Sequence, residues 1–238
     1  MNNINQLYVM AALHGDETFG LKIQSYLNQV NDIRINTAVG NPEAVAKRRE
    51  YIESDLNRSF SINIDTKETR LAKKILADIK RSKPDLIIDI HTCECDVGKV
   101  AILAQDDEWL ITLARKLGMD QVVVMHNDLA RQSLIGQNPN RSICLEFGST
   151  YRSDKLAEKI ASNIAGLLNG TSGYSSNVTH VYHVVGTIDK SHNTLDLKNY
   201  VFHSKLKGYP FLVGKNSYIN YAGFLAKRKP LSQAKRIV

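Results

Sequence analysis

The chain has 238 residues, 43% of them hydrophobic and 23% charged, a composition typical of a globular protein with a sizeable core. No apolar run approaches the roughly 20 residues that cross a bilayer, and the N-terminus lacks the features of a secretory signal. Three cysteines are an odd, sparse set that does not suggest a disulfide framework, so we expect a reduced, cytoplasmic protein. The net charge of +7 comes from scattered basic residues without interleaved aromatics. It therefore predicts neither a nucleic-acid nor a membrane partner, and it modestly favours small anionic ligands.

Apolar runs alternate with helical patterns along the first 170 residues. A functional loop is expected from Gly40 to about Ile64, where Pro, Asn, Asp and Arg gather. The alternation predicts an α/β domain over residues 1–169, with a mostly parallel, mixed central sheet and helices on both faces. Strands are predicted at 6–13, 33–39, 85–91, 99–103, 121–125 and 142–147, and helices at 17–29, 66–81, 107–117 and 153–168.

The pattern changes after residue 169, where a Gly/Ser/Thr-rich stretch indicates a boundary. Short β-like runs follow at 178–188, 200–202, 209–213 and 217–221, without a clear helix. We therefore expect residues 174–238 to form a small β-rich C-terminal domain.

Three metal-ligating side chains follow predicted strands. His14 and Glu17 come just after the first strand, and His91 ends the strand over 85–91. Strand ends meet at one edge of an open α/β sheet, which is where ligands bind. Two His and one Glu, with the fourth position left to water, form a catalytic zinc arrangement. Asp89 is expected either to orient His91 or to bond a backbone or helix terminus.

Further polar residues lie where a substrate would meet such a metal. Glu146 ends the strand over 142–147, where a carboxylate is costly unless it is paired or catalytic, and beside a metal it would act as general base. Asn57 and Arg58 lie in the long loop, and their amide and guanidinium suit a carboxylate.

The order of these motifs resembles the aspartoacylase and succinylglutamate desuccinylase family, within the zinc carboxypeptidase superfamily. The resemblance covers about residues 7–168, and it is looser in the C-terminal part. It implies one Zn²⁺ per chain on His14, Glu17 and His91, with Glu146 as the general base. It also implies substrate-binding roles for Asn57, Arg58, Arg131 and Tyr218. The motifs are His14-Gly15-Asp16-Glu17, Asn41-Pro42 leading to Asp55-Leu56-Asn57-Arg58, Asp89-Ile90-His91-Thr92, and Glu146-Phe147-Gly148.

The chain departs from the family pattern in several ways, one of which is a C-terminal part that looks shorter than the family's usual C-terminal domain. Asp16 replaces the usual Asn, and Ala12-Leu13 precedes the first motif where Gly is common. The family places an oxyanion-stabilising Arg directly before the aromatic residue that here is Tyr51. That position holds Glu50, so Arg49 takes the role after a one-residue shift, Arg48 takes it, or the role is unfilled.

The resemblance and the residues together predict a zinc-dependent amidohydrolase that deacylates a small, anionic N-acyl amino acid, most simply an acidic one. A carboxypeptidase that trims a peptide or a side-chain-linked amino acid is the alternative within the same chemistry. A non-catalytic protein that binds an anionic partner through Arg58 and the basic tail is the alternative of another class. A homo-oligomer is compatible with the sequence.

Overall fold

A nine-stranded mixed sheet runs through the molecule. The computed structural model describes residues 4–125, 127–171, 178–194, 196–214 and 220–231. The sheet order is β2-β1-β3-β6-β4-β5-β7-β9-β8. Most neighbouring strands are parallel, whereas the pairs β4·β6, β7·β9 and β8·β9 are antiparallel. The strands are β1 (Leu7–Ala11), β2 (Ile35–Val39), β3 (Leu86–Thr92), β4 (Lys99–Leu103), β5 (Gln121–Val124), β6 (Ser142–Phe147), β7 (His180–Asp189), β8 (Tyr209–Phe211) and β9 (Tyr221–Pro230).

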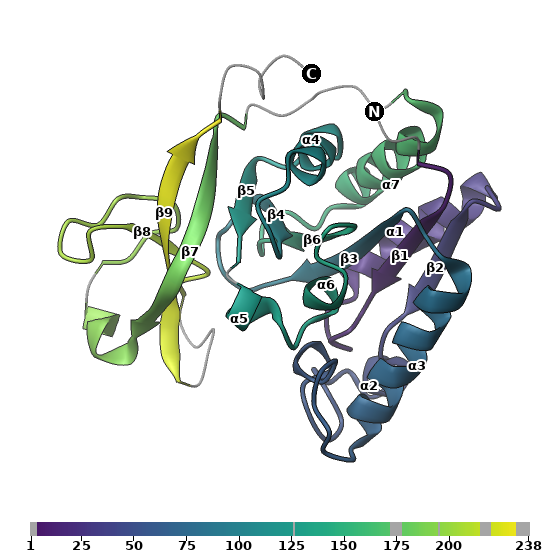
Figure 1. Ribbon diagram of the computed structural model, residues 1–238, viewed down its shortest axis with the longest axis horizontal. Coiled ribbons are helices and arrows are strands. Elements are labelled where there is room, and N and C mark those ends of the chain that lie inside the picture. The colour runs from purple at the N-terminus through teal and green to yellow at the C-terminus, as the bar shows by residue number, and fades with distance from the viewer. Residues whose placement is uncertain (1–3, 126, 172–177, 195, 215–219, 232–238) are drawn as a thin grey trace.

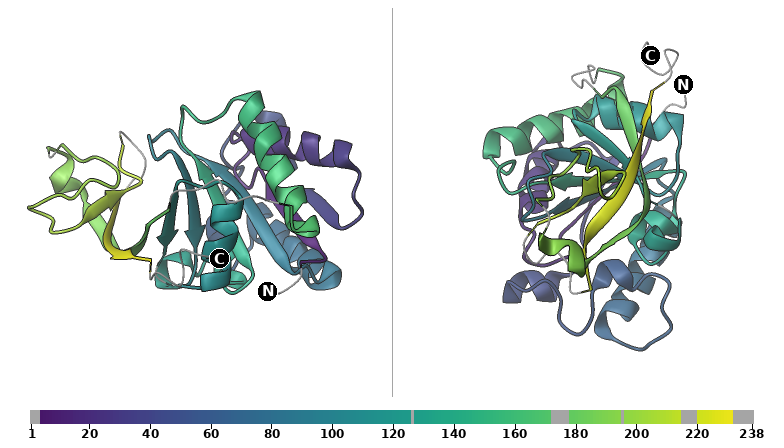
Figure 2. Two further views of the ribbon diagram at one scale, coloured as in Figure 1. Left: turned by 90° about the horizontal axis from the view of Figure 1, so that it is seen from above. Right: turned by 90° about the vertical axis from the view of Figure 1, so that its left-hand side faces the viewer.

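Helices cover both faces of this sheet, as the sequence predicts (Figures 1 and 2). The helices α1, α4 and α7 bury their apolar sides in one cluster with residues of β1 and β3, including Val9 and Ile88. Helix α3 packs on the other face, against Tyr8 and Met10, because successive side chains of a strand point to opposite faces. The helices are α1 (Phe19–Val30), α2 (Pro42–Lys47), α3 (Lys67–Ser82), α4 (Glu108–Lys116), α5 (Asn127–Ala130), α6 (Leu134–Gln137) and α7 (Asp154–Asn169), with 3₁₀ turns η1 (Leu56–Arg58) and η2 (Lys190–Thr194).

The observed helix starts lie close to the predicted ones because their capping side chains are recognisable in the sequence. Thr66 caps α3 in a capping box with Thr69, and the Ser153 side chain accepts a bond from the Leu156 N–H at the start of α7. The expected loop over 40–64 is wrong in part, since it contains α2 and η1. Both are too short for apolar periodicity to reveal them.

The C-terminal strands differ most from the prediction. Residues 200–202 form a turn rather than a strand, and Tyr200 has a φ of 63°, which no strand residue adopts. Strand β9 extends to Pro230, through a Lys-Arg-Lys stretch that hides its strand character in the sequence. Figure 1 shows β7, β8 and β9 to one side of the helices. Because β7 pairs in parallel with β5, these strands extend the main sheet, and the proposed division at residues 169–174 stays a prediction.

The sheet brings the ends of β1, β3 and β6 to one edge. β3 lies between β1 and β6, and His91 is directly opposite Glu146 in the register of β3 with β6. The predicted ligands therefore follow neighbouring strands. Among the described residues, no helix is long and apolar enough to cross a membrane.

Candidate active site

The turn after β1 presents His14 and Glu17 at the edge of the sheet. Gly15, between them, lies so close to α2 that an added Cβ would sit 2.2 Å from the backbone carbon of Ala44. Its N–H donates to the Glu50 carbonyl oxygen at 3.0 Å. Only glycine fits this close approach, so the turn and the start of α2 hold each other in place.

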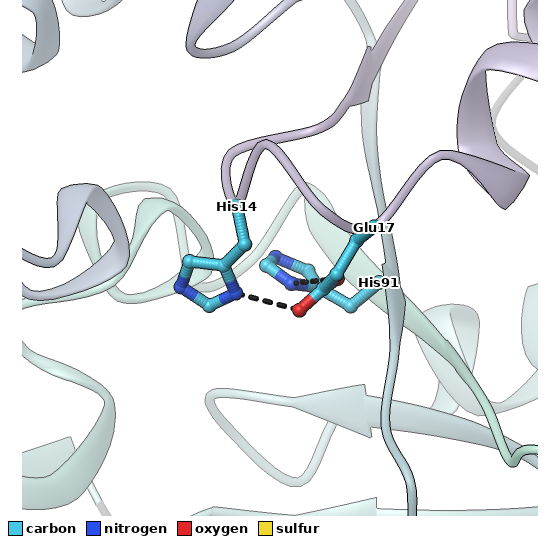
Figure 3. Close-up of side chains that lie close together, drawn as sticks. All are labelled: His14, Glu17 and His91. Carbon is cyan, nitrogen blue, oxygen red and sulfur yellow. Dashed lines mark hydrogen bonds and ion pairs between the residues drawn. The ribbon is translucent and has the colours of Figure 1, made fainter. Parts of the chain in front are cut away.

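His14, Glu17 and His91 converge on one point. The His14 Nδ1 atom lies 2.6 Å from Glu17 Oε1, and the His91 Nδ1 atom lies 3.0 Å from Glu17 Oε2. Figure 3 shows the Glu17 carboxylate between the two imidazoles. One ligand atom from each of the three residues lies within 4.8 Å of the others. The structure thus gathers the three predicted ligands, and it leaves His14 and Glu17 13% and 14% exposed, open to a substrate.

A second carboxylate holds the far nitrogen of each imidazole. His14 Nε2 lies 3.0 Å from Asp55 Oδ1, and His91 Nε2 lies 3.1 Å from Asp89 Oδ2. Such partners fix the ring orientation and the tautomer, leaving Nδ1 to bind a metal. For Asp89, the sequence predicted this orienting role and a bond to a backbone or helix terminus as equal alternatives. It gave no such role to Asp55, because a contact between residues 41 positions apart has no local signal.

Without a metal the two imidazoles hold protons. Burial opposes a charge on His14, but hydrogen bonds to Asp55 and Glu17 outweigh it and raise the pKa of His14 to about 10. Burial likewise opposes a charge on His91, yet the carboxylates of Asp89 and Glu17 raise its pKa well above its ordinary value. This cluster of carboxylates favours a cation at its centre, and an imidazole–carboxylate donor set is one that zinc accepts.

Glu146 is buried beside this cluster. The residue is 8% exposed, and its Oε1 atom has no hydrogen-bond partner. Burial and the nearby negative charge of Glu17 raise the pKa of Glu146 to about 8, against the opposing charges of His91 and His14. A carboxyl group with one free oxygen and such a pKa is suited to exchanging protons near neutral pH.

Asn57 and Arg58 belong to η1, next to the cluster. Asn57 Nδ2 lies 3.5 Å from His91 Nε2, and its Oδ1 accepts from the Leu134 N–H at 3.2 Å. The Arg58 guanidinium donates to the Asn57 carbonyl oxygen at 3.0 Å. It also hydrogen-bonds the Tyr221 hydroxyl at the start of β9. Sequence reasoning missed Tyr221, and the predicted Tyr218 lies outside the described residues.

The three arginines predicted to contact the acyl half of the substrate are all exposed. Arg48 and Arg49 are exposed at the end of α2, and Arg131 is exposed in the turn after α5. The side chain beside His14 is instead Glu50, whose carboxylate lies within 4.8 Å of ligand atoms of both His14 and Asp55. Burial and the charge of Asp55 raise the pKa of Glu50, although His14 opposes them. The oxyanion role of Arg49 and the substrate role of Arg131 therefore stay predictions.

A buried carboxylate anchors the loop that carries Asp55, Asn57 and Arg58. Glu68 of α3 is 1% exposed and accepts from the Ile52 N–H at 2.8 Å and from the Ser54 N–H at 3.1 Å. The Asn41 amide adds a bond at 3.2 Å. The loop is thus fixed to α3 directly before η1.

The fold and the cluster together have the donor set and strand-end placement typical of a metal-dependent hydrolase. Residues 3–170 match the family model of the succinylglutamate desuccinylase/aspartoacylase catalytic domain. The chain therefore belongs to this family.

Curated relatives agree with this assignment, and solved structures share the fold. A Nostoc sp. protein named "Probable aspartoacylase" is 30% identical over 132 residues, which cover 49% of this chain and 45% of that protein. A Xenopus laevis N-acyl-aromatic-L-amino acid amidohydrolase is 28% identical over 130 residues, covering 48% and 43%. The chain thus spans about half the length of these relatives. Murine aminoacylase 3 shares the fold, with a TM-score of 0.72 at 15% identity over 97% of each chain. Chromobacterium violaceum succinylglutamate desuccinylase has a TM-score of 0.72 at 12% identity, covering 97% and 86%.

Proposed function

We propose that the chain is a zinc-dependent amidohydrolase that hydrolyses the amide bond of a small N-acyl amino acid. The observation that carries this proposal is the convergence of His14, Glu17 and His91 within 4.8 Å beside the buried carboxyl of Glu146. The family membership supports the same chemistry.

Each site residue has a distinct task in this reaction. His14, Glu17 and His91 would hold the zinc ion, which would supply a Lewis acid able to polarise the amide carbonyl and to lower the pKa of water. Glu146 takes the proton of the attacking water and returns it to the nitrogen of the leaving amine. Asp55 and Asp89 keep both imidazoles oriented, as their contacts at 3.0 and 3.1 Å support.

Arg58 and Asn57 bind the carboxylate of the amino-acid half. The Arg58 guanidinium is held by the Asn57 carbonyl and by Tyr221, so it meets an anion with little loss of side-chain freedom. The net charge of +7 supports an anionic, acidic substrate. We further propose that Arg49 or Arg48 turns toward the developing oxyanion and that Arg131 and Tyr218 contact the substrate.

Hydrolysis and metal content test this proposal together. The wild-type chain is expected to hydrolyse N-acetylaspartate or a related N-acyl amino acid and to lose activity with a chelator. Glu146→Gln is isosteric and is expected to retain zinc while turnover falls by about two to four orders of magnitude. Unchanged turnover in Glu146→Gln would show that Glu146 is not the general base.

Glu50 favours a second candidate, a carboxypeptidase that acts on a peptide. Its carboxylate flanks His14, where the free ammonium of a dipeptide would be attracted and an acidic acyl group repelled. Glycyl and acetyl derivatives of one amino acid differ mainly by this ammonium. Preferential hydrolysis of the glycyl derivative, lost in Glu50→Gln, would support the peptidase over the deacylase.

A further inference from the structure

Cys93 lies beside the proposed general base, just past the end of β3. His91 is directly opposite Glu146 in the pairing of β3 with β6, so both side chains point to one face of the sheet. Side chains alternate along an extended chain, so Cys93, two residues after His91, returns to that face. The Cys93 N–H donates to the Phe147 carbonyl oxygen at 3.1 Å, which continues the β3–β6 ladder by one bond.

The Cys93 thiol contacts the Glu146 carboxyl group directly. A thiol can both donate and accept a hydrogen bond. The Cys93 sulfur lies 3.6 Å from the Cys95 carbonyl oxygen, and the thiol also hydrogen-bonds the Glu146 carboxyl group. Because Glu146 Oε1 has no partner among the described residues, the bond from Cys93 falls on the other carboxyl oxygen. The carboxyl group is therefore held on one side, with Oε1 left for the attacking water.

Arg152 and Gly148 fix the backbone that carries this thiol. The Arg152 guanidinium donates to the Cys93 carbonyl oxygen, and it bonds Glu94 Oε1 at 2.9 Å. Gly148, two residues after the base, lies so close to this loop that an added Cβ would sit 2.8 Å from the Cys95 carbonyl oxygen. The loop after β3 is thus tied to the segment after β6, and the distance between thiol and carboxyl group depends on few free torsions.

A packing role alone does not account for the place of Cys93. Cys144, on β6 two residues before Glu146, is a buried member of the apolar cluster, as a packing cysteine is expected to be. Cys93 is only partly buried and packs against the edge of that cluster. The hydrogen bond with Cys95 and burial raise the pKa of the Cys93 thiol, so it keeps its proton and can donate it.

We propose that Cys93 is a positioning residue for the base, whose thiol holds one oxygen of the Glu146 carboxyl group and leaves Oε1 to the attacking water. The kinetic consequence rests on the proposed function, whereas the contact itself does not. Because a thiol donates to a carboxylate and accepts from a protonated carboxyl, it keeps this bond while Glu146 takes up and returns a proton. A base held in one orientation stays aligned with the water through the reaction.

The pair Cys93→Ala and Cys93→Ser tests this role, because the two variants differ only by a hydroxyl. Cys93→Ala removes the hydrogen bond, so kcat for an N-acyl amino acid is expected to fall about fivefold or more, with KM and zinc content unchanged. Serine keeps a donor and an acceptor, so Cys93→Ser should stay within about threefold of wild type. The matched control is Cys144→Ala, which should lower the thermal midpoint with kcat retained.

Infrared spectroscopy tests the contact independently of hydrolysis. The S–H stretching band of Cys93 is isolated by subtracting the spectrum of the same protein carrying Cys93→Ala. This band is expected to shift when Glu146→Ala removes the carboxyl group that the thiol bonds. It should keep its position in Cys144→Ala, where the carboxyl group is retained.

The remaining outcomes contradict the proposal. Unchanged kcat in Cys93→Ala, or equal losses in Cys93→Ala and Cys93→Ser, would show that the hydrogen bond does not position the base. A raised KM with kcat retained would make Cys93 a substrate contact instead. An unshifted S–H band in an active enzyme would overturn the Cys93 proposal alone. If the wild-type chain hydrolyses no N-acyl amino acid, the proposed function fails, and the positioning role falls with it.

Discussion

Removing the Glu68 carboxylate should release the loop that carries Asp55, Asn57 and Arg58. Glu68 is 1% exposed, and its carboxylate accepts backbone hydrogen bonds from Ile52 at 2.8 Å and from Ser54 at 3.1 Å. Hydrogen bonds to a buried charged acceptor are each worth about 1.5–3 kcal/mol, and the orphaned N–H groups are costly. Glu68→Ala is therefore expected to lower the free energy of unfolding by about 3–5 kcal/mol.

Urea denaturation measures this loss, and a hydrolysis assay measures its effect on the site. Because backbone and Asn41 hydrogen bonds outweigh burial, the pKa of Glu68 is lowered in the folded state. Its contribution is thus present above the unfolded pKa of about 4.3 and is lost as the pH falls through the folded pKa. The difference between wild type and Glu68→Gln should accordingly shrink in acid.

The control is Glu43→Gln, which removes an exposed partner of Lys47 and Lys67. Such surface pairs contribute about 0–1 kcal/mol. If Glu68→Ala destabilised the protein no more than this control, or left kcat/KM unchanged, the anchoring role of Glu68 would be refuted.

Substitutions at three further positions test neighbouring parts of the account. Asp55→Asn weakens the hold on His14 Nε2, so zinc affinity should fall about 10- to 100-fold in a competition titration; unchanged affinity would exclude the orienting role. Arg58→Lys loses the planar fork, and KM should rise about tenfold with kcat nearly constant, while an equal fall in kcat would contradict simple carboxylate binding. Ala12 is fully buried with a φ of 54°, so Ala12→Gly should stay within about 1 kcal/mol of wild type in urea unfolding, whereas Ala12→Val should lose more than about 2 kcal/mol. If Ala12→Val were as stable as wild type, the backbone at residue 12 would not be strained.

The sequence predicts the residues that follow core strands better than those on loops. Strands β1, β3 and β6 are fully buried and mostly apolar, so the positions of His14, His91 and Glu146 at one sheet edge follow from the parallel arrangement. Loop contacts have no such periodicity. The approach of Asp55 and Glu50 to His14 depends on how residues 41–58 fold against Gly15.

The C-terminal strands illustrate the same limit. The contact of Tyr221 with Arg58 joins residues 163 positions apart through the pairing of β9 with β7, which the basic residues of β9 obscure in the sequence. The burial of the Tyr200 hydroxyl likewise depends on a left-handed backbone that no sequence pattern indicates. Both features become visible only after the sheet is assembled.

Zinc stoichiometry tests the central claim most directly. The wild-type chain, stripped with a chelator and titrated with zinc, is expected to bind about one ion per chain with recovery of hydrolysis. His91→Ala should fold but lose most of this binding, because one of the three converging ligands is removed. Zinc binding well below one ion per chain in the wild type, or undiminished binding in His91→Ala, would contradict the proposed site.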